Sequence, residues 1–237
     1  MQTPPTIPML RNFAVIFVLG PPGAGKGTLC THLAQTHNLK HYSVGDSLRS
    51  WMRENRTAPL AVQIQDKLDD QGFLDSDDLN PFILQAIKDA LYQAEPELQG
   101  ILIDGFPRCA GQLEGFLTWP FIIELPLVPS YQGAVMPIAK PDIVLCFSVT
   151  KENARARYLA RTRDSNDSEE KFERRFAEYE DKTVYVEEVY RQRRKLIDID
   201  SNGTREENVD TMTKTLGESR LWQKIMVEGR SEAHFLV

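Results

Sequence analysis

The sequence predicts an α/β fold in which a doubly wound, parallel sheet of five strands carries helices on both faces. Two observations support this prediction. Short apolar runs that do not alternate with polar residues recur along the 237-residue chain, as they do in strands buried on both faces. Helical patterns lie between these runs, and such alternation is typical of parallel strands joined by right-handed crossovers. Ligands of such sheets bind beyond the carboxyl ends of the strands.

The elements follow in chain order. The predicted strands are 13–19, 41–43, 101–104, 142–149 and 196–200, of which 41–43 has the weakest pattern. The clearest helical patterns span 28–37, 81–93 and 168–194. Residues 51–78 are helical and polar, so we expect them to project as a small subdomain. Residues 119–141 contain five prolines and predict an irregular loop, and the residues after 217 are compatible with a final helix.

Composition excludes several classes of protein. Hydrophobic residues make up 41% of the chain and charged residues 26%, which excludes a disordered chain, a collagen-like repeat and a disulfide-dense mini-protein. The net charge of −6 argues against general binding to nucleic acid or anionic membranes. The three cysteines are far apart, and their spacing to histidine does not indicate zinc. The apolar run 13–19 is too short to span a bilayer, and with no secretory signal pattern we expect a cytoplasmic protein.

A glycine-rich segment, GPPGAGKGT (20–28), follows the first predicted strand and opens a helix. Glycines allow backbone N–H groups to wrap phosphates closely, and the helix points its positive end at them. Lys26 can reach the β- and γ-phosphates, and the Thr28 hydroxyl can ligate Mg²⁺. Gly27 separates these two residues, whereas the general pattern places Ser or Thr directly after Lys. A glycine-rich turn can also cap an ordinary strand–helix junction, but here the strand, the Gly-Lys pair and the helix coincide.

Three further motifs indicate an acceptor site. SVGDSLR (43–49) places Arg49 one turn into a helix, where it could also be a solvated cation. GFL (72–74) is weak alone, because glycine often ends a helix. DGFPR (104–108) ends a buried strand, so that Asp104 can hold a water of Mg²⁺ and Arg108 can grip a phosphate with two N–H groups. A structural salt bridge between Asp104 and Arg108 is the alternative.

Gln112 lies one helical turn past Arg108. Its carboxamide offers a donor and an acceptor side by side, which complements the N6 amino group and a ring nitrogen of adenine. A surface glutamine is the alternative, because glutamine is mostly exposed.

Residues 155–175 are rich in arginine. Such charge runs usually form solvated faces. Arg157 and Arg161 are four residues apart and share one helix face. Arg175 flanks the apolar stripe of this region, whereas Arg174 points nearly opposite. Arg175 is therefore the candidate for the cleft and Arg174 for solvent.

These motifs, in this order and approximate spacing, resemble the adenylate kinase / UMP-CMP kinase family of short-lid nucleoside monophosphate kinases. The resemblance covers about 13–217. It implies a kinase domain over 13–217, with a part that binds the nucleoside monophosphate (NMP) at about 43–78 and a short lid at about 161–170. The tail 1–12 and the C-terminal extension 218–237 flank this domain.

The resemblance also implies the reaction MgATP + AMP ⇌ 2 ADP, with Mg²⁺ as cofactor. We expect a monomer that acts on small-molecule nucleotides. The implied catalytic cations are Lys26, Arg108, Arg161, Arg163 and Arg175. Thr28 would hold the metal, together with Asp104 through water. The implied ATP-binding residues are Gly23, Ala24, Gly25, Lys26, Gly27, Thr28, Arg157 and Gly203. The implied NMP-binding residues are Val44, Arg49, Phe73, Leu74, Asp75, Gly105, Arg108, Gln112, Arg163 and Arg175.

The chain departs from the family pattern at several positions. Val44 stands where Thr is common, and Asp75-Ser76 replaces a usual Val-Pro at the edge of the acceptor base. The lid is short and lacks a Ser-Gly-Arg, which puts the role of Arg163 in doubt. Gln112 resembles AMP-specific members, since UMP-CMP kinases usually carry Asn there. A UMP/CMP kinase and a nucleotide-binding protein with weak transferase activity therefore remain alternatives.

Overall fold

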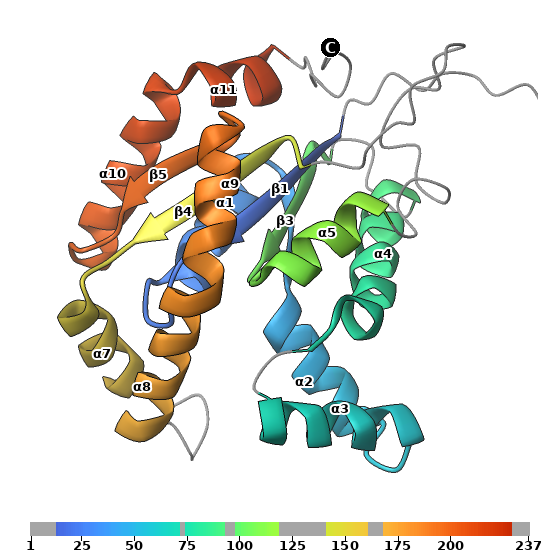
Figure 1. The fold of residues 1–237 in the computed structure, drawn as a ribbon. Coiled ribbons are helices and arrows are strands. Elements are labelled where there is room, and N and C mark those ends of the chain that lie inside the picture. The colour runs from blue at the N-terminus through green and yellow to red at the C-terminus, as the bar shows by residue number, and fades with distance from the viewer. Residues whose placement is uncertain (1–12, 72–73, 93–97, 119–140, 161–167, 229–237) are drawn as a thin grey trace, which may run out of the picture.

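The computed structural model describes residues 13–71, 74–92, 98–118, 141–160 and 168–228. Its centre is a five-stranded sheet in the order β2-β3-β1-β4-β5, and every neighbouring pair of strands is parallel (Figure 1). The predicted fold class is therefore confirmed. The strands are β1 (Ala14–Leu19), β2 (Leu39–Ser43), β3 (Gly100–Asp104), β4 (Ile143–Ser148) and β5 (Leu196–Asp200).

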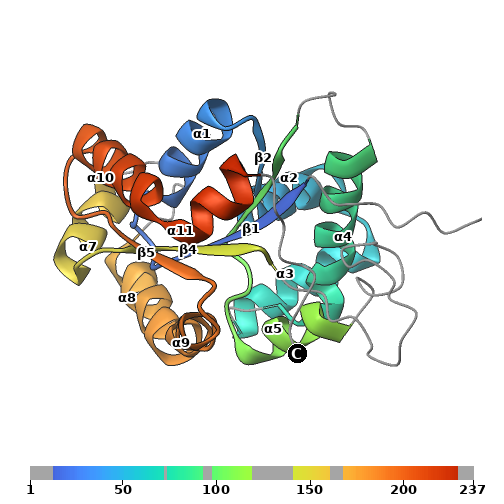
Figure 2. The ribbon, with the colours of Figure 1, turned by 90° about the horizontal axis from the view of Figure 1, so that it is seen from above.

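Helices cover both faces of the sheet (Figure 2). The predicted helical patterns 28–37 and 81–93 correspond to the helices Lys26–Thr36 and Ser76–Tyr92, the second of which begins earlier than predicted and contains Pro81. The predicted helix over 168–194 is interrupted by a π-helical turn, η1 (Tyr179–Thr183). The other helices are α1 (Lys26–Thr36), α2 (Val44–Glu54), α3 (Pro59–Gln71), α4 (Ser76–Tyr92), α5 (Ala110–Thr118), α7 (Lys151–Ala160), α8 (Glu169–Glu178), α9 (Val184–Gln192), α10 (Arg205–Glu218), the short α11 (Arg220–Trp222) and a second π-helical turn, η2 (Gln223–Val227).

Side chains of β1 alternate between two hydrophobic cores, one on each face of the sheet. Val15 and Phe17 pack with α4, α5 and α9. Ile16 and Val18 pack with α1, α10 and the C-terminal turns. A strand that is apolar at every position is therefore required by the fold, because both of its faces are buried.

The C-terminal extension is part of the body as far as residue 228. Trp222 is 2% exposed, and its ring lies against the ring of His37 on α1 with centroids 5.1 Å apart. Burial of a large aromatic side chain supplies a strong apolar anchor for this segment. The tail 1–12, most of the predicted loop 119–141 and residues 161–167 of the predicted lid lie outside the described residues.

The carboxyl ends of β1, β3 and β2, which are neighbours in the sheet, lie side by side. Val18 on β1 pairs with Asp104 on β3, and Ser43 on β2 pairs with the same Asp104. The glycine-rich loop, the SVGDSLR segment and the DGFPR segment therefore leave the sheet at one edge. Among the described residues, no helix is both long enough and apolar enough to cross a membrane.

Candidate functional site

A cavity of about 450 Å³ opens at this edge of the sheet. Because β1 is the central strand, the cavity extends to both sides of the loop that follows it. It reaches Arg49 after β2 on one side and the turn 203–205 after β5 on the other. The predicted site residues that line it are Gly23, Ala24, Gly25, Lys26, Gly27, Thr28, Arg49, Asp104, Arg108, Arg157, Arg175 and Gly203.

Other predicted residues lie elsewhere. Val44 and Leu74 are buried in the hydrophobic core, and Gly105 lines a smaller adjoining cavity. Asp75 is exposed and pairs with Lys67, with Nζ 3.3 Å from a carboxylate oxygen. Phe73, Arg161 and Arg163 are outside the described residues.

Two glycines let the loop after β1 approach the sheet and α7 closely. A Cβ on Gly20, whose φ is +132°, would lie 2.4 Å from the carbonyl oxygen of Phe147. A Cβ on Gly23, whose φ is +85°, would lie 2.1 Å from the carbonyl oxygen of Ala154. Any larger residue would therefore clash with main chain that cannot move aside, in addition to the strain of a positive φ.

Lys26 folds back over this loop. Its Nζ donates to the carbonyl oxygens of Gly20 at 2.7 Å and Pro21 at 2.8 Å. Burial lowers the pKa of Lys26 to about 8; nearby Asp104 opposes this shift, whereas Arg108 and Arg175 add to it. A partly buried ammonium with other cations nearby is stabilised by an anion.

Arg108 is fixed through both its side chain and its main chain. Its Nε donates to the carbonyl oxygen of Gly105 at 2.8 Å, and its backbone N–H donates to Gln112 Oε1 at 2.8 Å. Its own carbonyl oxygen accepts from the Thr183 hydroxyl at 2.9 Å. Burial and the nearby Arg175 lower the pKa of Arg108 to about 10. Its guanidinium is therefore held in place beside a second cation.

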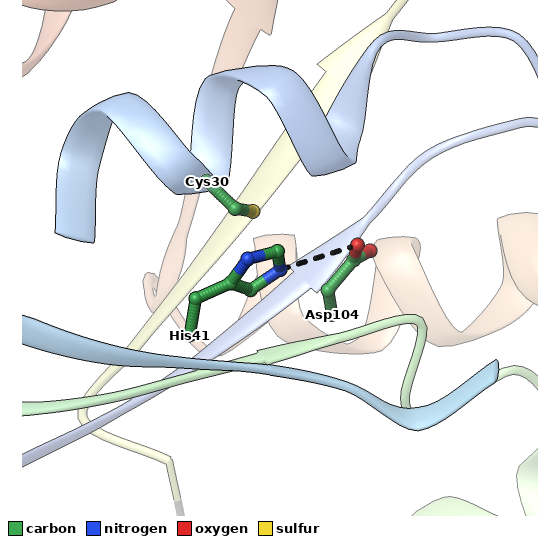
Figure 3. Close-up of side chains that lie close together, drawn as sticks. All are labelled: Cys30, His41 and Asp104. Carbon is green, nitrogen blue, oxygen red and sulfur yellow. Dashed lines mark ion pairs between the residues drawn. The ribbon is translucent and has the colours of Figure 1, made fainter. Parts of the chain in front are cut away.

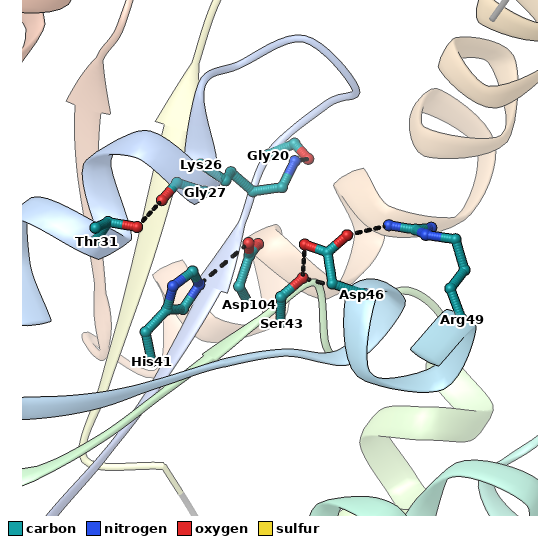
Figure 4. A network of polar contacts seen from close by, with 9 residues as sticks. All are labelled: Gly20, Lys26, Gly27, Thr31, His41, Ser43, Asp46, Arg49 and Asp104. Carbon is teal, nitrogen blue, oxygen red and sulfur yellow. Dashed lines mark hydrogen bonds and ion pairs between the residues drawn. The ribbon is translucent and has the colours of Figure 1, made fainter. Parts of the chain in front are cut away.

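Asp104 and Arg49 meet the cavity from β3 and α2 (Figure 4). Asp104 is 8% exposed, and its carboxylate lies 3.6 Å from His41 Nε2. Arg49 forms a close ion pair with Asp46, which also accepts from the Ser43 hydroxyl at 2.9 Å. Asp46 thus orients Arg49 rather than leaving it as a free surface cation.

Arg157 holds the turn between β5 and α10. Its guanidinium donates to the carbonyl oxygens of Ser201 and Gly203. The same two carbonyls accept from Asn208 Nδ2 at 3.1 Å and 3.0 Å. Arg157 therefore shapes the β5 side of the cavity, in addition to lining it.

Gln112 differs from its expected arrangement. It is 2% exposed and does not line the cavity within the described part of the chain. Its Nε2 donates to the carbonyl oxygen of Leu74 at 2.9 Å, while its Oε1 accepts from the backbone of Arg108. In this structure the carboxamide therefore links Leu74, which lies just before α4, to Arg108 of the DGFPR segment. Its donor and its acceptor are both used by main chain and are not presented to a base.

Sequence reasoning missed several residues at the site. Thr204, Arg205 and Asn208 line the cavity. Thr204 and Glu207 form a capping box at the start of α10, so the Thr-x-x-Glu pattern after the last strand was a usable signal. Ser43 and Gly45 also line the cavity; in the SVGDSLR motif only their neighbours Val44 and Arg49 were named as site residues. The hydrogen bond from Thr183 to Arg108 could not be predicted from local sequence, because it joins two distant segments.

Known proteins resemble this chain over most of its length. A family model described as "AAA domain" matches residues 19–173. Adenylate kinase 1 of Schistosoma mansoni is 32% identical over 82% of this chain and 88% of its own. Adenylate kinase 1 of Nostoc sp. is 33% identical over 85% and 98%, and adenylate kinase of Trichodesmium erythraeum is 34% identical over 84% and 93%. Identity at this level over nearly the whole length of the relatives shows that the chain belongs to the adenylate kinase family.

Proposed function

We propose that this protein transfers the γ-phosphoryl group of ATP to AMP, forming two ADP. The observation that carries the proposal is the cluster of Lys26, Arg108 and Arg175 around one cavity. Burial is the main cause of the lowered pKa values of Lys26 and Arg108, and the charge of neighbouring arginines adds to it. Phosphates placed among these cations would relieve their mutual repulsion, and an anionic transition state would gain most.

The two arms of the cavity support two nucleotides rather than one. The glycine-rich loop occupies the middle, where phosphates would be held by main-chain N–H groups and the start of α1. Gly203 and Asn208 on the β5 side suit the ATP base, and Arg49 on the β2 side suits the acceptor phosphate. Two nucleotides bound in this way would bring their phosphates together in line, which supplies the positioning that phosphoryl transfer needs.

The residues at the centre suit a magnesium ion. The exposed Thr28 and the carboxylate of Asp104 line the same cavity as Lys26, and oxygen ligands are those that Mg²⁺ prefers. Thr28 would bind the metal directly and Asp104 through water. The ion would neutralise charge on the transferred phosphates.

The roles of the side chains follow from their contacts. Lys26 would exchange its two carbonyl partners for phosphate oxygens of ATP. Arg108 and Arg49 would fix the acceptor phosphate, and Arg175 would bridge the two phosphate chains. Arg161 and Arg163 are proposed as further cations of the lid, on family resemblance alone.

A coupled assay of ADP formation, run with AMP, UMP and CMP in turn, tests the proposal. AMP is expected to be the best acceptor. A preference for UMP or CMP would favour the alternative acceptor specificity, and transfer to none of them would refute the kinase assignment.

Two variants test the site itself. Lys26→Ala and Arg108→Ala should each lower kcat/KM by about 100-fold or more, as loss of a preorganised cation does. Arg174→Ala is the matched control, because this neighbouring arginine is exposed and should retain activity. Near-normal turnover in either cavity variant would contradict the assigned roles.

A further inference from the structure

We infer that Cys30, His41 and Asp104 form a binding site for a zinc ion, separate from the proposed position of magnesium. The three side chains come from α1, β2 and the end of β3, and they point toward one another (Figure 3). One ligand atom from each lies within 4.8 Å of the others. Thiolate, imidazole and carboxylate are the three ligand types that proteins use for zinc.

The spacing of the imidazole nitrogen and the carboxylate oxygen is close to that of a tetrahedral site. Bonds of about 2.0 Å from zinc to nitrogen and oxygen place those two atoms roughly 3.3 Å apart. His41 Nε2 and the nearer Asp104 oxygen are 3.6 Å apart. The longer bond from zinc to sulfur would place Cys30 Sγ roughly 3.6 Å from the other two ligand atoms, whereas in the structure the three atoms lie within 4.8 Å of one another. Small side-chain rotations would complete three ligands, with water as the fourth.

His41 supplies the observation that points to a ligand. Its Nε2 is buried and has no hydrogen-bond partner, because 3.6 Å to Asp104 is too long for a hydrogen bond. Buried polar atoms are rarely left unsatisfied in native proteins. A metal bound between His41 and Asp104 would satisfy this nitrogen without moving β2 or β3.

The ligand chemistry favours zinc over magnesium. Magnesium prefers an octahedral set of oxygens and retains several waters, whereas Cys30 is fully buried and offers sulfur. Sulfur and imidazole ligands suit zinc. The site therefore discriminates against the ion that phosphoryl transfer uses.

Asp104 belongs to both sites, so zinc should inhibit the kinase. This consequence rests on the proposed function, in which Asp104 holds a water of magnesium. Zinc would withdraw that carboxylate while leaving Lys26 and the glycine-rich loop in place. Binding of zinc itself does not depend on the proposed function.

Cobalt(II) titration of the whole protein without nucleotide tests the binding site. Cobalt takes the same ligands, and a thiolate bound to it gives a charge-transfer band in the near ultraviolet. The wild-type protein should show this band, and added zinc should abolish it. Cys30→Ala should lose the band, and His41→Gln should bind cobalt at least about tenfold more weakly, as loss of a metal-site partner does.

Two matched controls separate this site from adventitious binding. Cys146→Ser removes another buried thiol, and His32→Gln removes a half-buried histidine of α1. Both should keep the band. Absence of a thiolate band in the wild type, or unchanged binding by both Cys30→Ala and His41→Gln, would overturn the site.

The inhibitory effect is measured separately, as ADP formation against rising zinc at fixed MgATP. Cys30→Ala and His41→Gln should remain active and need at least about tenfold more zinc for half inhibition, in line with the loss of a ligand. Equal sensitivity of wild type and variants would overturn the inhibitory role. If the wild type shows no kinase activity, the proposed function fails, and the cobalt titration still decides the metal site.

Discussion

The hydroxyl of Thr183 donates to the carbonyl oxygen of Arg108 at 2.9 Å, across 75 residues of sequence. Thr183 is the last residue of the π-helical turn η1, and Arg175 lies in the preceding α8. The segment formed by α8 and η1 therefore carries Arg175 and also contacts the main chain of Arg108. This hydrogen bond links the main chain at Arg108 to the helical segment that carries Arg175.

Thr183→Val tests this positioning role. It removes the hydroxyl from a buried position and leaves the Arg108 carbonyl without that donor, which should cost about 1 kcal/mol of stability. The KM for AMP should rise severalfold in steady-state assays, because Arg108 is less well held. Thr183→Ser should restore both values. A variant that loses stability with no change in KM would show that the bond is only structural.

Activity should depend on the protonation of Lys26. Its pKa is lowered to about 8 by burial, so the free enzyme carries the cation below this pH and loses it above. The value of kcat/KM for ATP should therefore fall as the pH rises through about 8. Lys26→Arg keeps its charge at these pH values, so its profile should be flat even where its rate is lower. A wild-type profile that is flat across pH 8 would contradict this prediction.

Gln112→Ala distinguishes the observed role of this side chain from contact with a base. Two hydrogen bonds, to Leu74 and Arg108, would be lost, and stability should fall by about 2 kcal/mol in urea unfolding. The acceptor KM should rise as well, because the backbone of Arg108 is released. Unchanged stability together with a raised KM for AMP would instead indicate direct contact with the base.

Asp75 and Asp78 both form ion pairs with Lys67, but we expect them to contribute differently to the stability of the protein. Asp78, whose side chain is 7% exposed, lies 2.7 Å from Lys67 Nζ and also accepts from the backbone N–H of Asp75 at 3.2 Å. The side chain of Asp75 is 70% exposed. Asp78→Ala should destabilise the protein by about 2 kcal/mol, and Asp75→Ala by less than about 0.5 kcal/mol. Thermal unfolding measures both, and equal effects would contradict the ranking.

Features carried by contiguous residues could be predicted from the sequence. The apolar runs predicted the strands, because a strand that is buried on both faces of the sheet is apolar at successive positions. The weakest of them, 41–43, is indeed the end of β2. The loop 20–28 was recognised because its glycines are contiguous in the sequence, and glycine is the residue that allows main chain to approach other groups closely.

Pairings between distant segments could not be predicted in this way. The carboxamide of Gln112 fits adenine or main chain equally well, and only packing against Leu74 and Arg108 decides which. Cysteine and histidine spacing gave no indication of zinc, because Cys30 and His41 meet only when α1 packs against the sheet. The sequence by itself determined the parallel sheet, the glycine-rich loop and the cationic residues, since local periodicity and backbone freedom encode them. The tertiary structure decided which of these residues face the cavity and which face one another, because strand order and register set those distances.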